Sequence, residues 1–224
     1  MVISDNRYGF THKTAHCVLI THQLNIKAPF ILFMANFINR AYINKFNEVW
    51  VPDYKEKNLR LAGELSDPGK ISIPVNYIGP QSALVHSTPV KRDSERSDYL
   101  ILLSGVEPQR TILENILITR MAFLQKKIIL VRGSNTHLSV EDKNIKVMDF
   151  CFGEQLRDLI VNADTVICRS GYSTLMDLHL LHKNKLILIP TPGQTEQEYL
   201  ASYWHEKFGS EALSQEVATK FNFK

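Results

Sequence analysis

The stretch TVICRSGYSTLMDLHLL, residues 165–181, decides the fold of this chain. Its first four residues, Thr165–Cys168, form an apolar run that predicts a buried strand. A Ser-Gly turn follows at 170–171, and the amphipathic segment Ser173–Leu181 predicts a helix. A buried strand that leads through a tight turn into a helix is the repeating unit of α/β sheets.

The start of this helix predicts a site for a nucleotide-sugar. The first N–H groups of a helix lack intrahelical acceptors, and the helix dipole is positive there, so a phosphate binds well. Asp177 lies one turn later, where its carboxylate can accept hydrogen bonds from both hydroxyls of a ribose. The alternative is an ordinary β–α turn with a solvated Asp177, which explains this stretch equally well. The predicted binding residues here are Arg169, Ser170, Gly171, Ser173, Thr174 and Asp177.

The rest of the chain continues the alternation of strand and helix. Further strands are predicted at 3–5, 17–21, 48–52, 99–103, 128–131, 145–150 and 186–189, and further helices at 29–46, 108–125, 155–163 and 197–207. The strands are short, apolar and β-branched, which is typical of a parallel sheet covered on both faces. The polar segment Lys55–Lys70 is predicted to be a surface loop.

Val166–Leu178 resembles the nucleotide-binding segment of the family 28 glycosyltransferases, which have the GT-B fold and are typified by the peptidoglycan lipid-II N-acetylglucosaminyltransferase. In that family an apolar strand ends in Cys-Arg-Ser-Gly, as at 168–171 here, and an acidic residue further on holds the ribose of UDP. Asp177 takes that position, with Asp for the more usual Glu. The resemblance implies transfer of a hexosyl unit from a UDP-sugar to a glycan or lipid-linked acceptor.

The loop after the strand at 186–189 extends the resemblance. The family carries a Gln-Gln pair and an Asn there, which contact the donor sugar and its phosphate. Gln197 and Glu198 fall on the pair, Ala201 stands at the Asn, and Gln194 lies just before them. Since Glu198 brings a negative charge in place of an amide, the family's usual donor sugar is not implied for this chain.

Two further loops match the family's donor site. Gly105 and Arg110 follow the strand at 99–103, and the resemblance makes Arg110 a partner of the diphosphate. The alternative is a plain connection with Pro108 at the first helical position. Phe150 and Cys151 lie in the loop that clasps uracil in the family through its backbone.

The segment Thr21–Asn25 resembles the family's acceptor-side His-Glu-Gln-Asn motif. His22 is therefore the candidate catalytic base, because the pKa of a histidine lies near working pH. The alternative is a capping or loop histidine.

The resemblance implies two Rossmann-like parallel-sheet domains, of which the N-terminal one is truncated. We expect a partial N-terminal domain at 1–76, a connection at 77–97, a C-terminal UDP-sugar domain at 98–208, and a C-terminal helix or tail at 209–224. Family members begin with a strand and a Gly-rich loop that have no counterpart here. We therefore expect either a fragment or a natural subunit completed by another polypeptide, with weak or no turnover alone.

Composition narrows the remaining possibilities. The 224 residues are 44% hydrophobic and 22% charged, as in ordinary globular proteins. A net charge of +3 does not favour a nucleic-acid partner, and no apolar run reaches the ~18 residues of a membrane span. The three cysteines suit a reducing cytoplasm. We expect no metal and no other cofactor, because GT-B enzymes generally need none and no Asp-x-Asp motif occurs.

Two other functions stay open. One is hydrolysis or epimerisation of a UDP-sugar on the same fold, and the other is a non-catalytic subunit or fragment that only binds the nucleotide-sugar. The predicted helix at 29–46 is apolar around more than one face, so it predicts either association with another subunit or docking on the inner face of a membrane.

Overall fold

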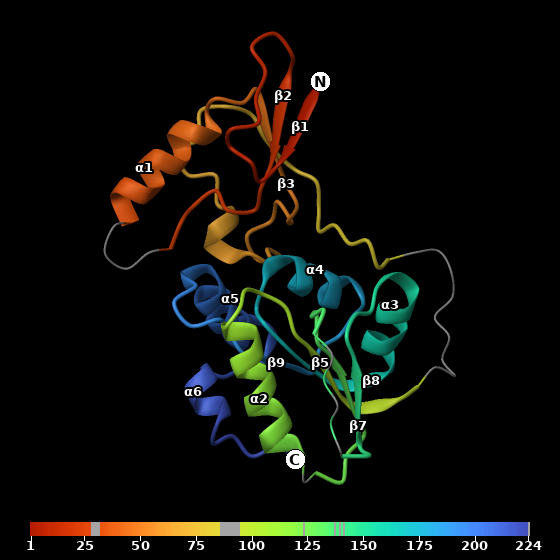
Figure 1. Cartoon of the computed structure of the whole chain (residues 1–224). Coiled ribbons are helices and arrows are strands. Elements are labelled where there is room, and N and C mark those ends of the chain that lie inside the picture. Colours follow the sequence, from red (N-terminus) through yellow and green to blue (C-terminus); the bar gives the residue numbers. More distant parts are fainter. Residues whose placement is uncertain are drawn as a thin grey trace. The chain divides into compact units, whose positions relative to one another are not determined.

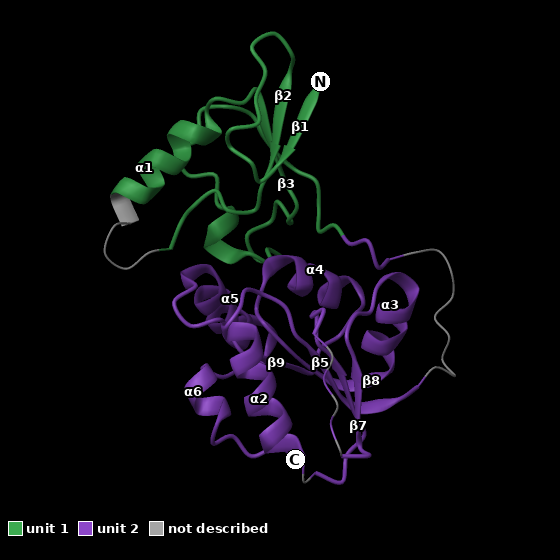
Figure 2. Cartoon of the chain, viewed as in Figure 1, with its two compact units in different colours: residues 1–81 green, residues 82–224 purple. Residues whose placement is uncertain are grey.

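The structure is a computed structural model that describes residues 1–27, 32–85, 95–122, 124–136, 138, 140 and 142–223. The chain divides into two compact units, Met1–Gln81 and Ser82–Lys224, which are coloured separately in Figure 2. Each unit contains one sheet, and all paired strands in both sheets are parallel. The predicted α/β class with two parallel sheets is confirmed.

Unit 1 is built on a four-stranded sheet and has a small hydrophobic core of its own. The strands are β1 (Val2–Asp5), β2 (Cys17–Ile20), β3 (Glu48–Val51) and β4 (Val75–Tyr77), and they pair in that order. Helix α1 (Leu32–Ile43) follows β2, and the predicted start of this helix at Pro29 lies outside the described residues. Its last residue, Ile43, packs with Leu19 and Val49 in the core.

The prediction of a surface loop at Lys55–Lys70 was wrong for the middle of that segment, residues 60–66. Leu61, Ala62 and Leu65 are fully buried. Ala62 immediately precedes the short 3₁₀ helix η1 (Gly63–Ser66), and Leu65 lies within it. The buried carboxylate of Asp53 accepts hydrogen bonds from the N–H groups of Leu61 and Ala62 and from the Ser66 hydroxyl. Because this carboxylate satisfies the backbone, the segment can fold inward despite its polar composition.

Unit 2 is a six-stranded sheet in the order β10-β9-β8-β5-β6-β7. Its strands are β5 (Ser97–Leu102), β6 (Ile128–Val131), β7 (Ile145–Met148), β8 (Ala163–Cys168), β9 (Leu186–Leu188) and β10 (Glu211–Ala212). Its helices are α2 (Gln109–Met121), α3 (Gly153–Asn162), α4 (Tyr172–Leu180), α5 (Thr195–Phe208) and α6 (Gln215–Ala218). These strands and helices were predicted to within a few residues, except for β10 and α6, which lie in the segment predicted only as a C-terminal helix or tail.

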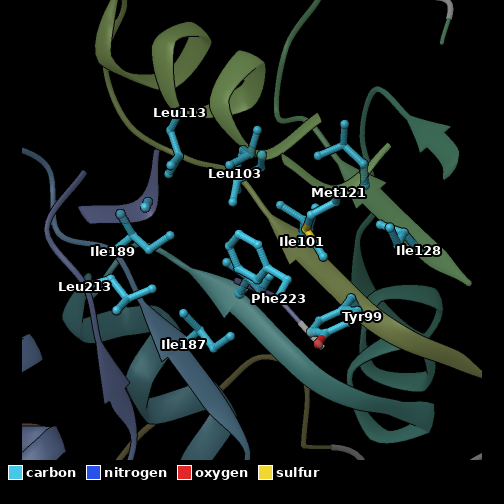
Figure 3. Close-up of a cluster of buried hydrophobic side chains, with 14 of the residues drawn as sticks. Tyr99, Ile101, Leu103, Leu113, Met121, Ile128, Ile187, Ile189, Leu213 and Phe223 are labelled. Atoms are coloured by element: carbon cyan, nitrogen blue, oxygen red, sulfur yellow. The ribbon is translucent and has the colours of Figure 1, made fainter. Parts of the chain in front are cut away.

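The main core lies between α2 and one face of this sheet (Figure 3). Tyr99, Ile101 and Leu103 alternate along and just beyond β5, so their side chains point to that face, while Leu100 is buried on the other. Figure 1 shows α2 and α6 on one side of the sheet and α3 on the other. The predicted C-terminal helix or tail belongs to this core, because Phe223 is buried and its ring meets Tyr99 edge to face.

The order of the strands creates a switch point between β5 and β8. The chain runs outward from β5 through β6 to β7, and α3 then returns it to β8 on the opposite side of β5. The loops that leave β5 and β8 therefore diverge at their carboxyl ends. In open parallel sheets this divergence leaves a crevice in which ligands bind.

Candidate functional site

A pocket of about 180 Å³ lies at this switch point. Its wall combines the ends of β5 and β6, the loop after β7, and parts of α3 and α4. The lining residues are Leu84, Leu102, Leu103, Ser104, Val131, Gly133, Phe150, Cys151, Phe152, Leu156, Ile160, Thr174 and Asp177. The pocket is thus mostly apolar with one carboxylate, which is the usual character of a small-molecule site.

The close approach of two of these loops depends on Gly133. Its φ is +63°, and a Cβ at this position would lie 2.8 Å from the carbonyl oxygen of Leu103. Any other residue would therefore push the loop after β6 away from the loop after β5. Sequence reasoning missed Gly133, because a single glycine after a strand predicts a turn but not its neighbour.

The start of α4 lies beside the pocket, and Thr174 of its first turn forms part of the pocket wall. The residue before the helix, Gly171, is extended, and among the described residues no side chain caps the first turn. A Cβ built on Gly171 would meet nothing within 4 Å, so the space in front of the helix is open. The N–H groups of Ser173 and Thr174 lie in the first turn of the helix, where intrahelical acceptors are lacking, so they can bind an anion, and the helix dipole favours negative charge there.

Asp177 is the carboxylate of the pocket and lies on the same helix, one turn beyond Thr174. Burial raises the pKa of Asp177, while a hydrogen bond from the Ser82 hydroxyl, 2.5 Å from Oδ1, opposes that shift. The structure thus brings Asp177 to the pocket, and its role as an acceptor of ligand hydroxyls stays a prediction. Sequence reasoning did not identify Ser82, since it lies 95 positions away in the chain.

Ser170 joins the loop after β8 to the first turn of α5. It is fully buried, and its hydroxyl donates to the carbonyl oxygen of Gln197 at 2.7 Å. The amide of Gln197 in turn donates to Gln194 Oε1 and accepts from the N–H of Thr191. Glu198 Oε1 accepts from the N–H of Gly193. The predicted donor-sugar residues therefore shape the loop at 191–194 in this structure and do not line the pocket.

Arg169 is enclosed by carbonyl oxygens and not by anions. Its guanidinium is buried and donates to the carbonyls of Ile189, Pro190 and Gln109 and to the side chain of Gln215. Burial lowers the pKa of Arg169 to about 10. The side chain thus fastens the loop after β9 to the start of α2 and to α6, and it does not reach the pocket.

Arg110 belongs to a buried ionic network. Glu114 accepts hydrogen bonds from Arg110 Nη1 at 3.1 Å and from Arg132 Nε at 2.6 Å, and all three side chains are almost fully buried. Glu107 and Asp149 supply further carboxylates, one to each arginine. The structure therefore encloses Arg110, the predicted diphosphate partner, within this network. Gly105 lies in the exposed loop before Arg110. Its φ is +106°, and a Cβ built on it would meet nothing within 4 Å.

The loop after β7 places two aromatic rings at the pocket. The rings of Phe150 and Phe152 stack at 5.8 Å with 14° between their planes. Between them Cys151 is buried, and burial raises the pKa of its thiol. The structure thus brings the predicted Phe150 and Cys151 to the pocket and adds Phe152, which sequence reasoning missed although it is a large exposed ring beside them.

His22, the candidate base, lies in unit 1, in the turn that follows β2. The turn is shaped by Thr21, whose hydroxyl donates to Asn6 and accepts from the N–H of Gln23. His22 is partly exposed there. Its catalytic role stays a prediction.

Within the described ranges, no group of three or more His, Cys, Asp or Glu residues is arranged to hold a metal ion. The described helices also include none that is long and apolar enough to cross a membrane.

The profile of a family described as "Glycosyltransferase family 28 C-terminal domain" matches residues 109–223. No curated protein sequence matches the chain. Among solved structures it is similar to the glycotransferase of kitacinnamycin, with 12% identity and a TM-score of 0.59 over 89% of this chain and 58% of that one. MurG from Acinetobacter baumannii matches with 14% identity and a TM-score of 0.55, over 92% and 57% of the two chains.

The spinosyn rhamnosyltransferase SpnG, solved with thymidine diphosphate, matches with 12% identity and a TM-score of 0.53, over 92% of this chain and 61% of that one. The chain therefore spans roughly three fifths of the length of these proteins. At identities this low, the structural similarity shows a shared fold and nothing further.

Proposed function

The chain belongs to the family of the glycosyltransferase family 28 C-terminal domain, and from that premise we propose that it transfers a hexosyl unit from a UDP-sugar to a glycan or lipid-linked acceptor. The observation that carries the proposal is the pocket at the β5–β8 switch point. It sets one carboxylate, Asp177, beside the uncapped start of α4. A nucleoside diphosphate carries hydroxyls and negative charge at matching positions.

We assign each part of the donor to a part of the pocket. The uracil would lie against the loop at 150–152, whose apolar rings suit a flat base. The ribose hydroxyls would donate to Asp177, and the diphosphate would face the N–H groups at the start of α4. Because Arg110 and Arg169 are engaged elsewhere, backbone N–H groups carry most of the charge compensation in this proposal.

The reaction would proceed by direct displacement at the sugar. An acceptor hydroxyl oxygen forms the new bond to the anomeric carbon as the bond from that carbon to the phosphate oxygen breaks. UDP leaves with the electron pair, and a base takes the hydroxyl proton. His22 is the proposed base, and no metal is required, since the helix N-terminus stabilises the charge on the leaving diphosphate.

We also propose a cytoplasmic location, peripheral on the inner face of the membrane, with a lipid-linked acceptor like that of the lipid-II enzyme. The three cysteines are buried and unpaired, which supports a reducing compartment. Association with a further subunit is part of the same proposal.

The test is a single-turnover assay with the chain in excess over a labelled UDP-sugar, so that even slow transfer is detected. A panel of UDP-sugars is used, with and without vesicles that contain a lipid-linked glycan acceptor. We expect label to move to the acceptor, and we expect Asp177→Ala to abolish the transfer while Asp164→Ala, on the exposed side of β8, leaves it unchanged. Release of free sugar at the same rate without acceptor would indicate a hydrolase instead. UDP binding without any release would indicate a binding subunit.

A further inference from the structure

The loops that follow β6 and β7 meet beside the pocket. They supply four of its lining residues, Gly133, Phe150, Cys151 and Phe152. The N–H of Arg132 donates to the carbonyl oxygen of Met148 at 2.9 Å, where the two paired strands end. The N–H of Ser134 then donates to the carbonyl oxygen of Asp149 at 3.3 Å. The position of the aromatic rings at the pocket therefore depends on how these two loops are held together.

The side chain of Arg132 adds a charged link between the two loops. It is 3% exposed, and its Nη1 donates to Asp149 Oδ1 at 2.9 Å and to the carbonyl oxygen of Thr136. Its Nε and Nη2 donate to the two carboxylate oxygens of Glu114 on α2, at 2.6 and 3.0 Å. Since a guanidinium is planar, this paired contact with Glu114 fixes the direction in which Nη1 points. Arg132 thus fastens both loops to α2.

Asp149 directly precedes the aromatic rings at the pocket. Phe150 and Phe152 are 41% and 73% exposed, so the protein encloses these rings only in part. The loop is anchored instead by Asp149, which Arg132 holds, and by the buried Cys151. Neither Arg132 nor Asp149 lines the pocket. The ion pair therefore acts on a bound ligand by way of the rings beside it.

We propose that Arg132 is a positioning residue for the base of the donor nucleotide. Through Asp149 it holds Phe150 and Phe152 where a flat base packs against them. This inference rests on the proposed function, since it assumes that a nucleoside diphosphate binds in the pocket. Its consequence is selective: loss of the ion pair should weaken the binding of the base and leave the binding of the diphosphate, at the start of α4, unchanged.

The test substitutes Asp149, because Arg132 is buried and its removal would disturb the contact with Glu114 that stabilises unit 2. Calorimetry on the folded full chain gives the Kd of UDP, and displacement of UDP gives that of inorganic pyrophosphate, which lacks the base. In Asp149→Ala we expect UDP to bind at least about fivefold more weakly, while pyrophosphate stays within about twofold. Asp149→Asn loses the charge but keeps an oxygen that accepts from Arg132, so UDP should bind within about twofold of the unsubstituted chain.

Asp98→Ala is the matched control. The side chain of Asp98 is 42% exposed against 40% for Asp149, and it accepts a hydrogen bond from the N–H of Lys127 at 2.8 Å. Because Asp98 lies near the amino end of β5, away from the pocket at the carboxyl ends of the strands, both affinities should stay unchanged.

Three results would overturn the inference while leaving the proposed function standing. The first is an unchanged Kd of UDP in Asp149→Ala, and the second is an equal loss for UDP and pyrophosphate, which would indicate a general disturbance of unit 2. The third is a loss in Asp149→Asn as large as in Asp149→Ala, which would assign the effect to charge and not to position. If the folded unsubstituted chain does not bind UDP, the proposed function fails, and the inference fails with it.

Discussion

Removing the Glu114 carboxylate should destabilise unit 2 more than any surface substitution. Glu114 is 2% exposed and joins two buried arginines: it accepts from Arg110 Nη1 at 3.1 Å, from Arg132 Nε at 2.6 Å and from Arg132 Nη2 at 3.0 Å. The hydrogen bonds that Arg132 donates to Glu114 hold the pKa of Arg132 above its ordinary value. Because an arginine side chain stays protonated in proteins, both guanidinium groups remain charged and buried when the carboxylate is taken away.

Breaking a buried ion pair by removing one partner typically costs about 3–5 kcal/mol. Each arginine here keeps a second carboxylate, Arg110 that of Glu107 and Arg132 that of Asp149, and both of these are well exposed to solvent. For that reason we expect Glu114→Ala to fall at the lower end, about 3 kcal/mol. Glu114→Gln keeps the shape but loses the charge, and should cost about 1.5–3 kcal/mol.

The measurement is urea unfolding followed by the fluorescence of Trp204, which is buried in unit 2, in a background where Trp50 of unit 1 is replaced by Phe. A single tryptophan keeps the unfolding of unit 2 apart from that of unit 1. The control is Glu206→Ala on the exposed side of α5, which should change the free energy of unfolding by less than about 0.5 kcal/mol. A loss below about 1 kcal/mol in Glu114→Ala would refute the view that this network is held together by its central carboxylate.

Three further predictions concern the loops, the pocket and α1. Gly133→Ala should destabilise unit 2 by about 1–3 kcal/mol, because φ is positive and the new Cβ would clash with the Leu103 carbonyl; an unchanged unfolding midpoint would contradict the close approach. Burial raises the pKa of Asp177, so its protonated form is favoured by folding and that contribution is lost as pH rises through the raised pKa. Asp177→Asn should therefore be more stable than the unsubstituted chain at pH 7, by a margin that shrinks in acid, and a constant margin in urea unfolding from pH 4 to 8 would disprove the shift. On α1 the side chains of Met34, Phe37 and Ile38 are 61%, 67% and 48% exposed, and burying each is worth about 1.5–3 kcal/mol. We therefore expect the chain to self-associate or to sediment with anionic vesicles, and we expect Phe37→Ser to weaken either process. A stable monomer that does not sediment with vesicles would exclude both self-association and vesicle binding.

Most of the fold could be predicted from the sequence because the parallel strands consist of continuous apolar runs. Runs such as Ile128–Val131 and Thr165–Cys168 are buried on both faces and lie between helices with clear periodicity. The β10 strand is only two residues long and carries no such run, so it could not be recognised. The burial of the segment after Asp53 was also hidden, because it depends on a carboxylate that satisfies backbone groups eight and nine residues away.

The candidate site was predictable where a local pattern creates it. The strand, turn and helix at 165–181 place Asp177 one turn beyond the open start of α4, as their order along the chain implies. Side chains whose role depends on distant partners were not predictable. Arg169 meets backbone carbonyls from two other segments and the Gln215 side chain, and Arg110 meets a carboxylate shared with Arg132, so neither points to the pocket. Ser82 and Gly133 join the site only through the tertiary fold.

The most direct test of a nucleoside diphosphate site at the β5–β8 switch point is a calorimetric titration of the chain with UDP. Asp177→Ala and Asp164→Ala are titrated alongside, because Asp177 lines the pocket whereas Asp164 is an exposed carboxylate of β8 that does not. We predict that UDP binds the unsubstituted chain and Asp164→Ala equally, and that Asp177→Ala loses about 1–3 kcal/mol of binding free energy. A folded chain that shows no binding of UDP, or an Asp177→Ala variant that binds UDP as tightly as the unsubstituted chain, would contradict the account.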